Sequence, residues 1–237
     1  MEKLITICAR GGSKGIPGKN IRPINGIELI GYTIQHAFSL SKKISADIAL
    51  STDCLKIKNI ATKFNLQTNY IRPESLSGDS VGKIETIRHL LEFEESHRLK
   101  TYDYIFDLDV SSPLRNIQDL ISAFEILKQN PGAQNLFSVN KANRNPYFNM
   151  VEKKENGYYS LVKKGNFLTR QSSPEVFELN ASFYIYKRDF FNNKLPKTIG
   201  ENSLVYEMPH ICFDLDHSID FDFMEYLIIQ NKLGFSL

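Results

Sequence analysis

Cysteine and long apolar runs are both scarce in this sequence. The three cysteines, Cys8, Cys54 and Cys212, are widely separated and show none of the short spacings of metal ligands. An odd, dispersed set of this kind is typical of buried thiols in a reducing compartment. No apolar stretch approaches the roughly 18 residues of a membrane-spanning helix, and a predicted strand starts by residue 3 without a long apolar segment before it. We therefore expect a cytoplasmic protein that does not enter a membrane.

The sequence also lacks the residue patterns of common hydrolytic sites. Ser13, Ser51 and Ser111 have no nucleophile-elbow context, and no two of the five histidines have the spacing of a metal-binding pair. These absences disfavour a covalent mechanism. Transfer at a nucleotide phosphate remains, because positioning and charge neutralisation supply most of the catalysis in such reactions.

A strong net charge is absent, but the charges are unevenly distributed. Lysine and arginine number 29 against 27 acidic residues, a net charge of +2, so we expect no nucleic-acid partner. Residues 1–25 hold five basic residues and one acid. Residues 214–225 hold no lysine or arginine and five acids, which are Asp214, Asp216, Asp220, Asp222 and Glu225. The two segments would suit a site for phosphate and a metal ion if the fold joins them; otherwise they are separately solvated surfaces.

Residues 7–20, Ile-Cys-Ala-Arg-Gly-Gly-Ser-Lys-Gly-Ile-Pro-Gly-Lys-Asn, form the most distinctive stretch. A short apolar strand leads into a loop with four glycines and three basic residues. Glycine lets backbone amides approach an anion, and Arg10, Lys14 and Lys19 add donors that hold phosphate. The stretch matches neither the P-loop nor the dinucleotide fingerprint, so a basic surface turn is an alternative. Its position after the first predicted strand favours phosphate binding, because ligands of open α/β sheets bind at the carboxyl ends of strands.

Hydrophobic periodicity predicts alternating strands and helices along the chain. Helices are expected over residues 29–40, 55–64, 84–97, 117–129 and 221–231. Strands are expected over residues 4–9, 44–50, 68–71, 104–110, 137–139, 181–186 and 203–208. This alternation predicts an α/β fold with a doubly wound, mostly parallel sheet, in a single domain of residues 1–237.

Residues 140–175 interrupt this alternation. Two strand-like segments flank Glu155-Asn156-Gly157, and Asn-Gly between such segments is a strong hairpin signal. We expect a β-hairpin that protrudes from the sheet and serves as a lid, a dimerisation element, or both.

Polar side chains follow the predicted strands, as a nucleotide pocket along the carboxyl edge of the sheet requires. They are Arg10, Ser51 with Asp53, Arg72, and Asp109 with Ser111. Simpler roles are possible for some of them. We expect Asp53 to act as a helix N-cap, and the run 111–113, Ser-Ser-Pro, could be only a tight turn.

Asp220 and Asp222 are candidate magnesium ligands. Two carboxylates at this spacing before a helix can converge on a hard cation, which would bridge them to phosphates. Capping of the final helix is the alternative. The presence of a glycine- and lysine-rich loop in the same chain favours the metal site.

Motifs along nearly the whole chain occur in the order of one enzyme family. They are residues 9–20, Ser51-Thr52-Asp53, Arg72-Pro73, residues 111–115, Arg170-Gln171, Asn180-Ala181 and residues 218–222. With these motifs the chain resembles the cytidylyltransferases that activate nonulosonic acids, the CMP-sialic acid synthetases and their relatives.

The resemblance implies a Rossmann-like fold, a homodimer formed through the protruding hairpin, and the Mg²⁺-dependent reaction of CTP with a 2-keto sugar acid to give a CMP-sugar and pyrophosphate. It implies catalytic roles for Lys14, Lys19, Asp220 and Asp222, the last two also binding magnesium. It places CTP against Ala9, Arg10, Ser13, Asn20, Arg72 and Lys83. It places the sugar against Asp109, Ser111, Ser112, Phe148, Arg170, Gln171 and Asn180.

Three positions depart from the sialic-acid enzymes. Those enzymes have a glutamine where this chain has Asp109, a lysine where it has Phe148, and often a serine where it has Lys83. The run 108–113, Leu-Asp-Val-Ser-Ser-Pro, is similar to the branch that acts on legionaminic acid and related 5,7-diamino sugars. We therefore expect N,N'-diacetyllegionaminic acid as the sugar. Sialic acid, Kdo, and a role as a nucleotide-binding regulatory module are the alternatives.

Overall fold

The central element is a six-stranded sheet with one antiparallel strand. The computed structural model describes residues 1–12, 15–78, 81–192 and 197–237. The strand order is β10-β6-β9-β5-β1-β4. These strands are β1 (Lys3–Cys8), β4 (Asp47–Ser51), β5 (Tyr104–Leu108), β6 (Asn135–Lys141), β9 (Phe177–Lys187) and β10 (Ser203–Glu207). β1 is parallel to β4 and β5, β10 is parallel to β6, and only β9 runs antiparallel to its neighbours β5 and β6. The predicted α/β fold with a mostly parallel sheet is confirmed.

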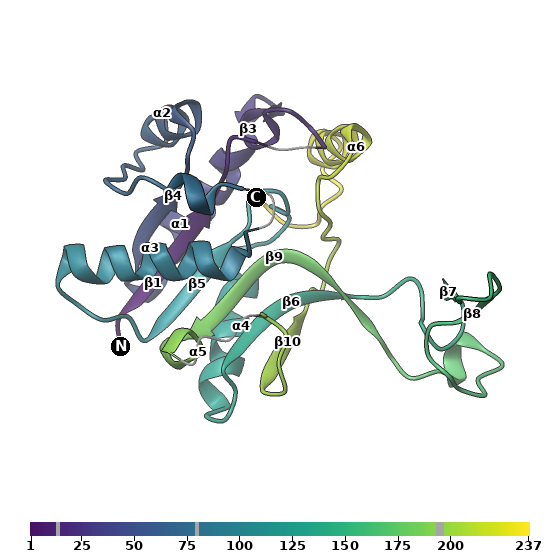
Figure 1. Cartoon of the computed structure of the whole chain (residues 1–237). Helices are drawn as coiled ribbons and strands as arrows, with labels where there is room; N and C mark the ends of the chain where they lie inside the picture. Colours follow the sequence, from purple (N-terminus) through teal and green to yellow (C-terminus); the bar gives the residue numbers. More distant parts are fainter. Residues whose placement is uncertain (13–14, 79–80, 193–196) are drawn as a thin grey trace.

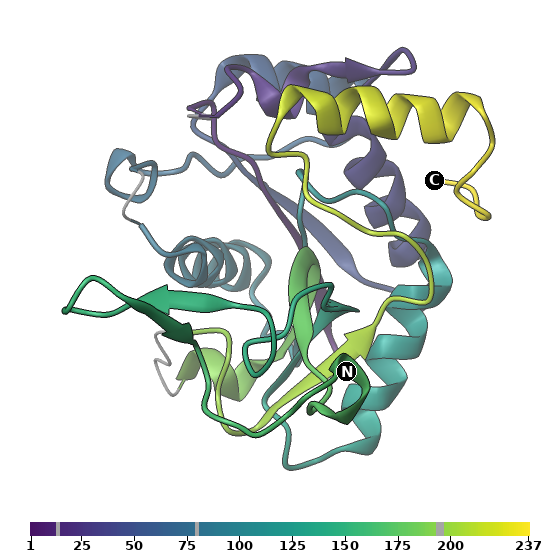
Figure 2. The same ribbon diagram turned by 90° about the vertical axis from the view of Figure 1, so that its right-hand side faces the viewer.

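Helices cover both faces of this sheet (Figure 1). One face packs against α1 (Leu29–Ile44), α4 (Ile117–Gln129) and α6 (Ser218–Ile229), and α2 (Leu55–Lys63) packs beside α1. The other face packs against α3 (Lys83–Arg98) and α5 (Arg188–Asn192). Successive residues of β1 alternate between the two cores, since Ile5 packs with α1 whereas Leu4 packs on the face of α3. Figure 2 shows α6, α1 and α4 on one side of the sheet and α3 on the other.

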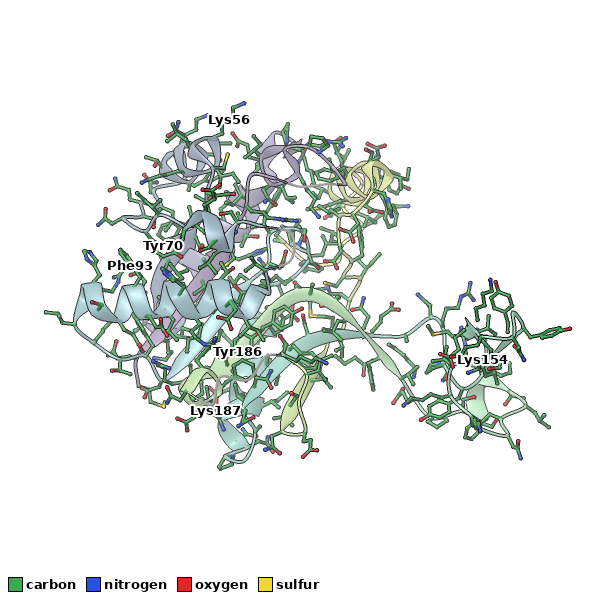
Figure 3. All side chains as sticks on the ribbon, in the orientation of Figure 1. Lys56, Tyr70, Phe93, Lys154, Tyr186 and Lys187 are labelled. Atoms are coloured by element: carbon green, nitrogen blue, oxygen red, sulfur yellow. The ribbon has the colours of Figure 1, made fainter. Side chains whose placement is uncertain are left out.

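The predicted strand at residues 68–71 is wrong. This segment has no regular secondary structure and forms no ladder with β4. Side chains make its contacts instead: the hydroxyl of Thr68 donates to the carbonyl of Leu50 at 3.0 Å, and the buried Tyr70 ring packs edge-on against Phe93 of α3 at a centroid distance of 5.2 Å. Figure 3 shows Tyr70 next to Phe93 above this helix. Packing of an aromatic side chain therefore replaces strand pairing.

A small hairpin was not predicted. β2 (Pro23–Ile24) and β3 (Ile27–Glu28) pair across Asn25-Gly26, where both residues have positive φ, 47° and 77°. Positive φ at both central positions is the geometry that Asn-Gly favours in two-residue turns. Asn25-Gly26 is a sequence signal for such a turn. The hairpin was missed because its strands are only two residues long and show no apolar alternation.

The segment 140–175 leaves the sheet as an arm (Figure 1). It carries the predicted hairpin, in which β7 (Val151–Lys153) pairs with β8 (Tyr159–Leu161) across a turn where Gly157 has a φ of 84°. In Figure 3, Lys154 lies on this arm, far from Tyr186 in the central sheet. In the described part of the chain, no helix is both long and apolar enough to cross a membrane.

Candidate active site

A cavity of about 430 Å³ lies where β1 and β5 end, at the carboxyl edge of the parallel strands. It collects side chains from the loop after β1, from the segment 72–81, from α3 and from the residues after β5. The expected residues that line it are Arg10, Lys19, Asn20, Arg72, Lys83, Asp109 and Ser111. Asp216 also lines it, from the acidic segment near the end of the chain. The fold therefore joins the basic and the acidic segments that the charge pattern singled out.

The basic loop is shaped by buried contacts at its far end. Ile16 is buried, Gly18 adopts a left-handed conformation (φ 69°), and the 3-10 helix η1 (Lys19–Ile21) follows. The amide of the buried Asn20 donates to the carbonyl of Arg10 at 2.9 Å. Asn20 therefore ties the end of the loop to its start, and its contact with a nucleotide stays a prediction. Ser13 and Lys14 lie outside the described residues.

Asp53 holds the start of the same loop. Its carboxylate accepts a hydrogen bond from the backbone N–H of Gly11 at 2.7 Å. The N-cap residue of α2 is Cys54, which makes no side-chain capping bond, so the expected role of Asp53 as an N-cap is wrong. The carboxylate of Asp53 therefore binds the loop after β1 and not the first turn of α2.

Arg72 is buried, and its contacts fix its orientation. Its Nε donates to the hydroxyl of Ser51 and its Nη2 to the carbonyl of Ser51, both at 2.8 Å. The last residue of β4 thus anchors the guanidinium, which lines the cavity. Ala9 is also buried and contributes through its backbone, since its N–H donates to the same carbonyl at 2.9 Å.

Lys83 lies between two aspartates on the wall formed by α3 and β5. Its Nζ is 2.7 Å from Asp107 Oδ2 and 2.6 Å from Asp109 Oδ2. Burial alone would lower the pKa of Lys83, but the two negative charges outweigh it and raise that pKa well above its usual value. Burial likewise opposes ionisation of Asp109, yet Lys83 and the donors of Ser111 lower its pKa to about 2. Lys83 and Asp109 therefore stay charged across the physiological range.

The acidic segment contributes Asp214 and Asp216 to this region. Asp216 Oδ1 is 3.1 Å from Lys19 Nζ. Asp214 Oδ1 is buried and has no hydrogen-bond partner. Burial, and then the charges of Asp109 and Asp216, raise the pKa of Asp214 to about 7, and Lys19 and Lys83 offset this only in part. Both carboxylates are therefore close to the basic loop.

Asp220 and Asp222 occupy the first turns of α6 outside the cavity. Asp220 Oδ2 accepts hydrogen bonds from the backbone N–H groups of Asp216 and His217, at 2.9 and 2.6 Å, as a helix cap. Asp222 is exposed, with Oδ1 3.9 Å from Nη2 of Arg22. The sequence pattern could be read either as a metal pair or as a cap, and Asp220 has the contacts of the cap. Their role in metal binding stays a prediction.

The other residues expected on the sugar side do not line this cavity. Ser112 is fully buried and donates to the carbonyl of Phe213 at 3.2 Å. Asn180 is buried where β9 departs from its pairing with β6, and its Oδ1 accepts from the hydroxyl of Ser138 at 2.6 Å. Phe148, Arg170 and Gln171 belong to the arm, where the last two line a second cavity of about 410 Å³. Their contact with a sugar also stays a prediction.

One buried residue organises the cavity edge and was not among the candidates. Arg115 is fully buried, and its Nη1 donates to the carbonyls of Asp109, Ser112 and Ser182, at 3.0, 2.9 and 2.7 Å. Its Nη2 reaches the hydroxyl of Thr33 at 3.0 Å. Arg115 thus ties the segment after β5 to β9 and α1. The sequence offered one indication of this role: Arg115 is the last residue of the motif 111–115, Ser-Ser-Pro-Leu-Arg.

Comparison with known families and proteins agrees with the resemblance that the sequence motifs indicated. The family model described as cytidylyltransferase matches residues 4–232. A Campylobacter coli protein named post-translational flagellin modification protein B is 41% identical over 233 residues, which cover 98% of this chain and 97% of that protein. A Campylobacter jejuni protein named CMP-N,N'-diacetyllegionaminic acid synthase is 40% identical over 234 residues, with the same coverage.

A solved structure has the same fold. The structure of CMP:2-keto-3-deoxy-manno-octonic acid synthetase complexed with CTP superposes with a TM-score of 0.68 at 16% identity, covering 98% of this chain and 100% of that one. With a match over nearly the whole length, and with a cavity that joins basic and acidic residues at the carboxyl ends of parallel strands, this chain belongs to the cytidylyltransferase family.

Proposed function

We propose that this chain transfers the cytidylyl group of CTP to N,N'-diacetyllegionaminic acid and releases pyrophosphate. The observation that carries the proposal is the 40% identity over 98% of the chain to the Campylobacter jejuni protein with that name. The cavity supports it chemically. Arg10, Lys19 and Arg72 supply positive charge for a triphosphate, and the carboxylate of Asp216 lies among them.

In this reaction the anomeric oxygen of the sugar acid attacks the α-phosphorus of CTP. A phosphorus–oxygen bond forms while the bond from the α-phosphorus to the oxygen that bridges to the β-phosphorus breaks. The proton of the anomeric hydroxyl passes to solvent water, and pyrophosphate leaves with the bridging oxygen. Lys19 and Arg10 hold the departing charge, so their contribution is positioning and electrostatic stabilisation rather than covalent chemistry.

Magnesium, which the family resemblance implies, is best supported at Asp214 and Asp216. Asp214 has a buried oxygen without a partner, and Asp216 lines the cavity beside Lys19. Within the described ranges, no group of three or more potential ligands comes together. Mg²⁺ commonly takes one or two carboxylates and completes its shell with phosphates and water. Bound there, the ion would neutralise charge on the phosphates. Asp220 and Asp222 are the alternative ligands.

The arm supports a homodimer. Its exposed apolar side chains are numerous for a surface feature of this size: Met150, Val151, Tyr158, Tyr159, Val162 and Leu168. A hairpin of two three-residue strands that projects from the body is not stable in isolation unless its apolar face is covered. A second copy of the chain is the partner we propose. Such packing would also bring Phe148, Arg170 and Gln171 against another protomer rather than leave them in solvent.

A pyrophosphate-release assay with CTP and Mg²⁺ tests the function across a panel of acids: N,N'-diacetyllegionaminic acid, N-acetylneuraminic acid and Kdo. We expect the highest kcat/KM with the first. A clear preference for N-acetylneuraminic acid or for Kdo would replace the proposed sugar while leaving the reaction in place. Absence of pyrophosphate release with every acid, while CTP still binds, would favour the nucleotide-binding regulatory module.

A further inference from the structure

The two aspartates that hold Lys83 have every oxygen engaged within the protein. The Oδ2 atoms of Asp107 and Asp109 contact the ammonium of Lys83, at 2.7 and 2.6 Å. Asp107 Oδ1 accepts from the hydroxyl of Thr6 at 2.9 Å. Asp109 Oδ1 accepts from both the backbone N–H and the hydroxyl of Ser111 at 2.8 Å. Asp109 lines the cavity, but it does not present an unengaged oxygen to a ligand.

Lys83 has one donor left. An ammonium group carries three N–H bonds. Asp109 Oδ2 accepts a hydrogen bond from one of them, and the ion pair with Asp107 Oδ2 occupies the side of a second. The side chain is a third exposed and lines the cavity, while the ring of Tyr184 covers another side with its centroid 5.0 Å from Nζ. The remaining N–H is therefore the charged donor that this wall offers to a ligand.

The charge of the cluster limits which ligand can accept that hydrogen bond. Two carboxylates and one ammonium have a net charge of −1, and the pKa directions of Lys83 and Asp109 keep them ionised. A phosphate or carboxylate at the free N–H would lie close to both aspartates and be repelled. An uncharged carbonyl oxygen meets the same donor without that repulsion.

Resting on the proposed function, we propose that Lys83 determines substrate specificity by donating its third N–H to an uncharged carbonyl oxygen of a substrate. Two groups have this chemistry: the ring carbonyl of cytosine and the carbonyl of an N-acyl substituent on the sugar. Asp107 and Asp109 are positioning residues that act through Lys83. Asp109 then influences the choice of substrate without touching it.

Steady-state kinetics of Lys83→Met test this assignment. We expect a KM about 10- to 100-fold higher for one substrate, the range for a lost hydrogen bond from a charged donor, and a KM within about 2-fold for the other. A raised KM for CTP identifies cytosine, and a raised KM for the sugar identifies the acyl group. In the second case the effect disappears with the corresponding de-N-acylated sugar. Asp109→Asn should raise the same KM by a smaller factor with kcat nearly unchanged.

Lys100→Met is the matched control. Lys100 Nζ also lies between two carboxylates, 2.5 Å from Asp47 and 2.8 Å from Glu2, but outside the cavity. Its removal should leave both KM values unchanged. If Lys83→Met unfolds because two carboxylates lose their partner, the double variant Lys83→Met, Asp109→Asn removes one of those charges and must show the same rise in KM.

Several outcomes would overturn the assignment of Lys83. They are unchanged KM values for both substrates, an equal rise in both, or a raised KM for pyrophosphate in the reverse reaction, which would mean phosphate binding. Failure of the proposed function is a different result, because the wild-type protein itself would then form no CMP-sugar.

Discussion

The carboxylate of Asp53 accepts a hydrogen bond from the backbone N–H of Gly11 at 2.7 Å, so the turn after β4 fixes the start of the basic loop after β1. The two segments approach closely because Gly11 has no side chain. A Cβ there would lie 2.9 Å from Cβ of Cys54. The loop that we propose for the triphosphate is thus positioned by the neighbouring strand as well as by its own sequence.

Asp53→Ala should lower kcat/KM for CTP by about 5- to 10-fold, as expected for losing about 1 kcal/mol of hydrogen bonding that positions the loop. Asp53→Asn keeps an acceptor and should stay within about 3-fold of the wild type. Steady-state kinetics at saturating sugar measure both. Equal losses in the two variants would mean that the charge, rather than the hydrogen bond to Gly11, matters.

Asp216→Asn should lower kcat by about 100-fold or more and raise the Mg²⁺ concentration needed for half-maximal activity, because the carboxylate would lose its charge beside the metal and phosphates. Asp222→Asn is the comparison, since Asp222 is exposed and does not line the cavity. Its activity should remain within about 3-fold. The reverse ranking in a magnesium titration would return the metal site to Asp220 and Asp222.

Arg115→Met should destabilise the protein by about 3–5 kcal/mol, because it removes buried hydrogen bonds from a charged donor to the carbonyls of Asp109, Ser112 and Ser182 and to the hydroxyl of Thr33. Urea unfolding followed by circular dichroism measures this difference. Arg144→Met, at an exposed position on the arm, should change the free energy of unfolding by less than about 0.5 kcal/mol. A similar small effect for Arg115 would show that water replaces its contacts.

The pair of His210 and Asp119 should make stability depend on pH. His210 Nε2 is 2.8 Å from Asp119 Oδ2. Burial lowers the pKa of His210, but the hydrogen bond to Asp119 and the carbonyl of Ile211 outweigh burial and raise it. A raised folded-state pKa contributes stability that is fully present below the unfolded value, about 6.5, and is lost as the pH rises through the folded-state pKa.

The loss of melting temperature in His210→Gln should therefore be larger at pH 5.5 than at pH 8.5, as measured by differential scanning calorimetry. In an Asp119→Asn background the same substitution should have an effect that no longer depends on pH. A pH-independent loss in the otherwise native chain would contradict the ion pair.

Tyr159→Asp should convert the proposed dimer into monomers, because it places a charge on the exposed apolar side of β8. Light scattering coupled to size-exclusion chromatography measures the mass. Lys154→Asp, at the polar turn of the same hairpin, should leave the dimer intact. A monomeric wild-type protein would rule out the proposed role of the arm.

The strands and helices of the sheet could be predicted because their apolar periodicity is strong. The bounds of α4, for example, match the prediction, since Asn116 and Asp119 form a capping box there. Residues 68–71 have the composition of a strand, but whether such a segment pairs depends on a partner distant in the sequence. Here Tyr70 packs against Phe93 of α3, and the segment pairs with no strand.

The basic half of the site could be predicted residue by residue, and its acidic half only as a segment. Arg10 and Lys19 come after β1, whose end lies at the carboxyl edge of the sheet, where ligands of this fold bind. Arg72 was expected after a strand at residues 68–71 that does not form, and its bonds to Ser51 at the end of β4 hold it at the same edge. Asp214, Asp216, Asp220 and Asp222 lie within nine residues of each other, and spacing alone does not tell which of them precedes the helix and which caps it. The bond between Lys83 and Asp109 joins positions 26 residues apart and required coordinates.

The sheet order also constrains how the chain is assembled during synthesis. β6 has only β9 and β10 as neighbours, and both are made after it. Strands β4, β1 and β5 can pair once residue 108 has left the ribosome, but β6 must wait until the arm and residue 187 have followed. Half of the sheet, including the strands that end at the cavity, can therefore form first, while the amide groups of β6 stay without strand partners. In that interval β6 is the strand of this sheet most prone to pair with a wrong segment. It is then also a binding site for a chaperone that recognises extended apolar segments.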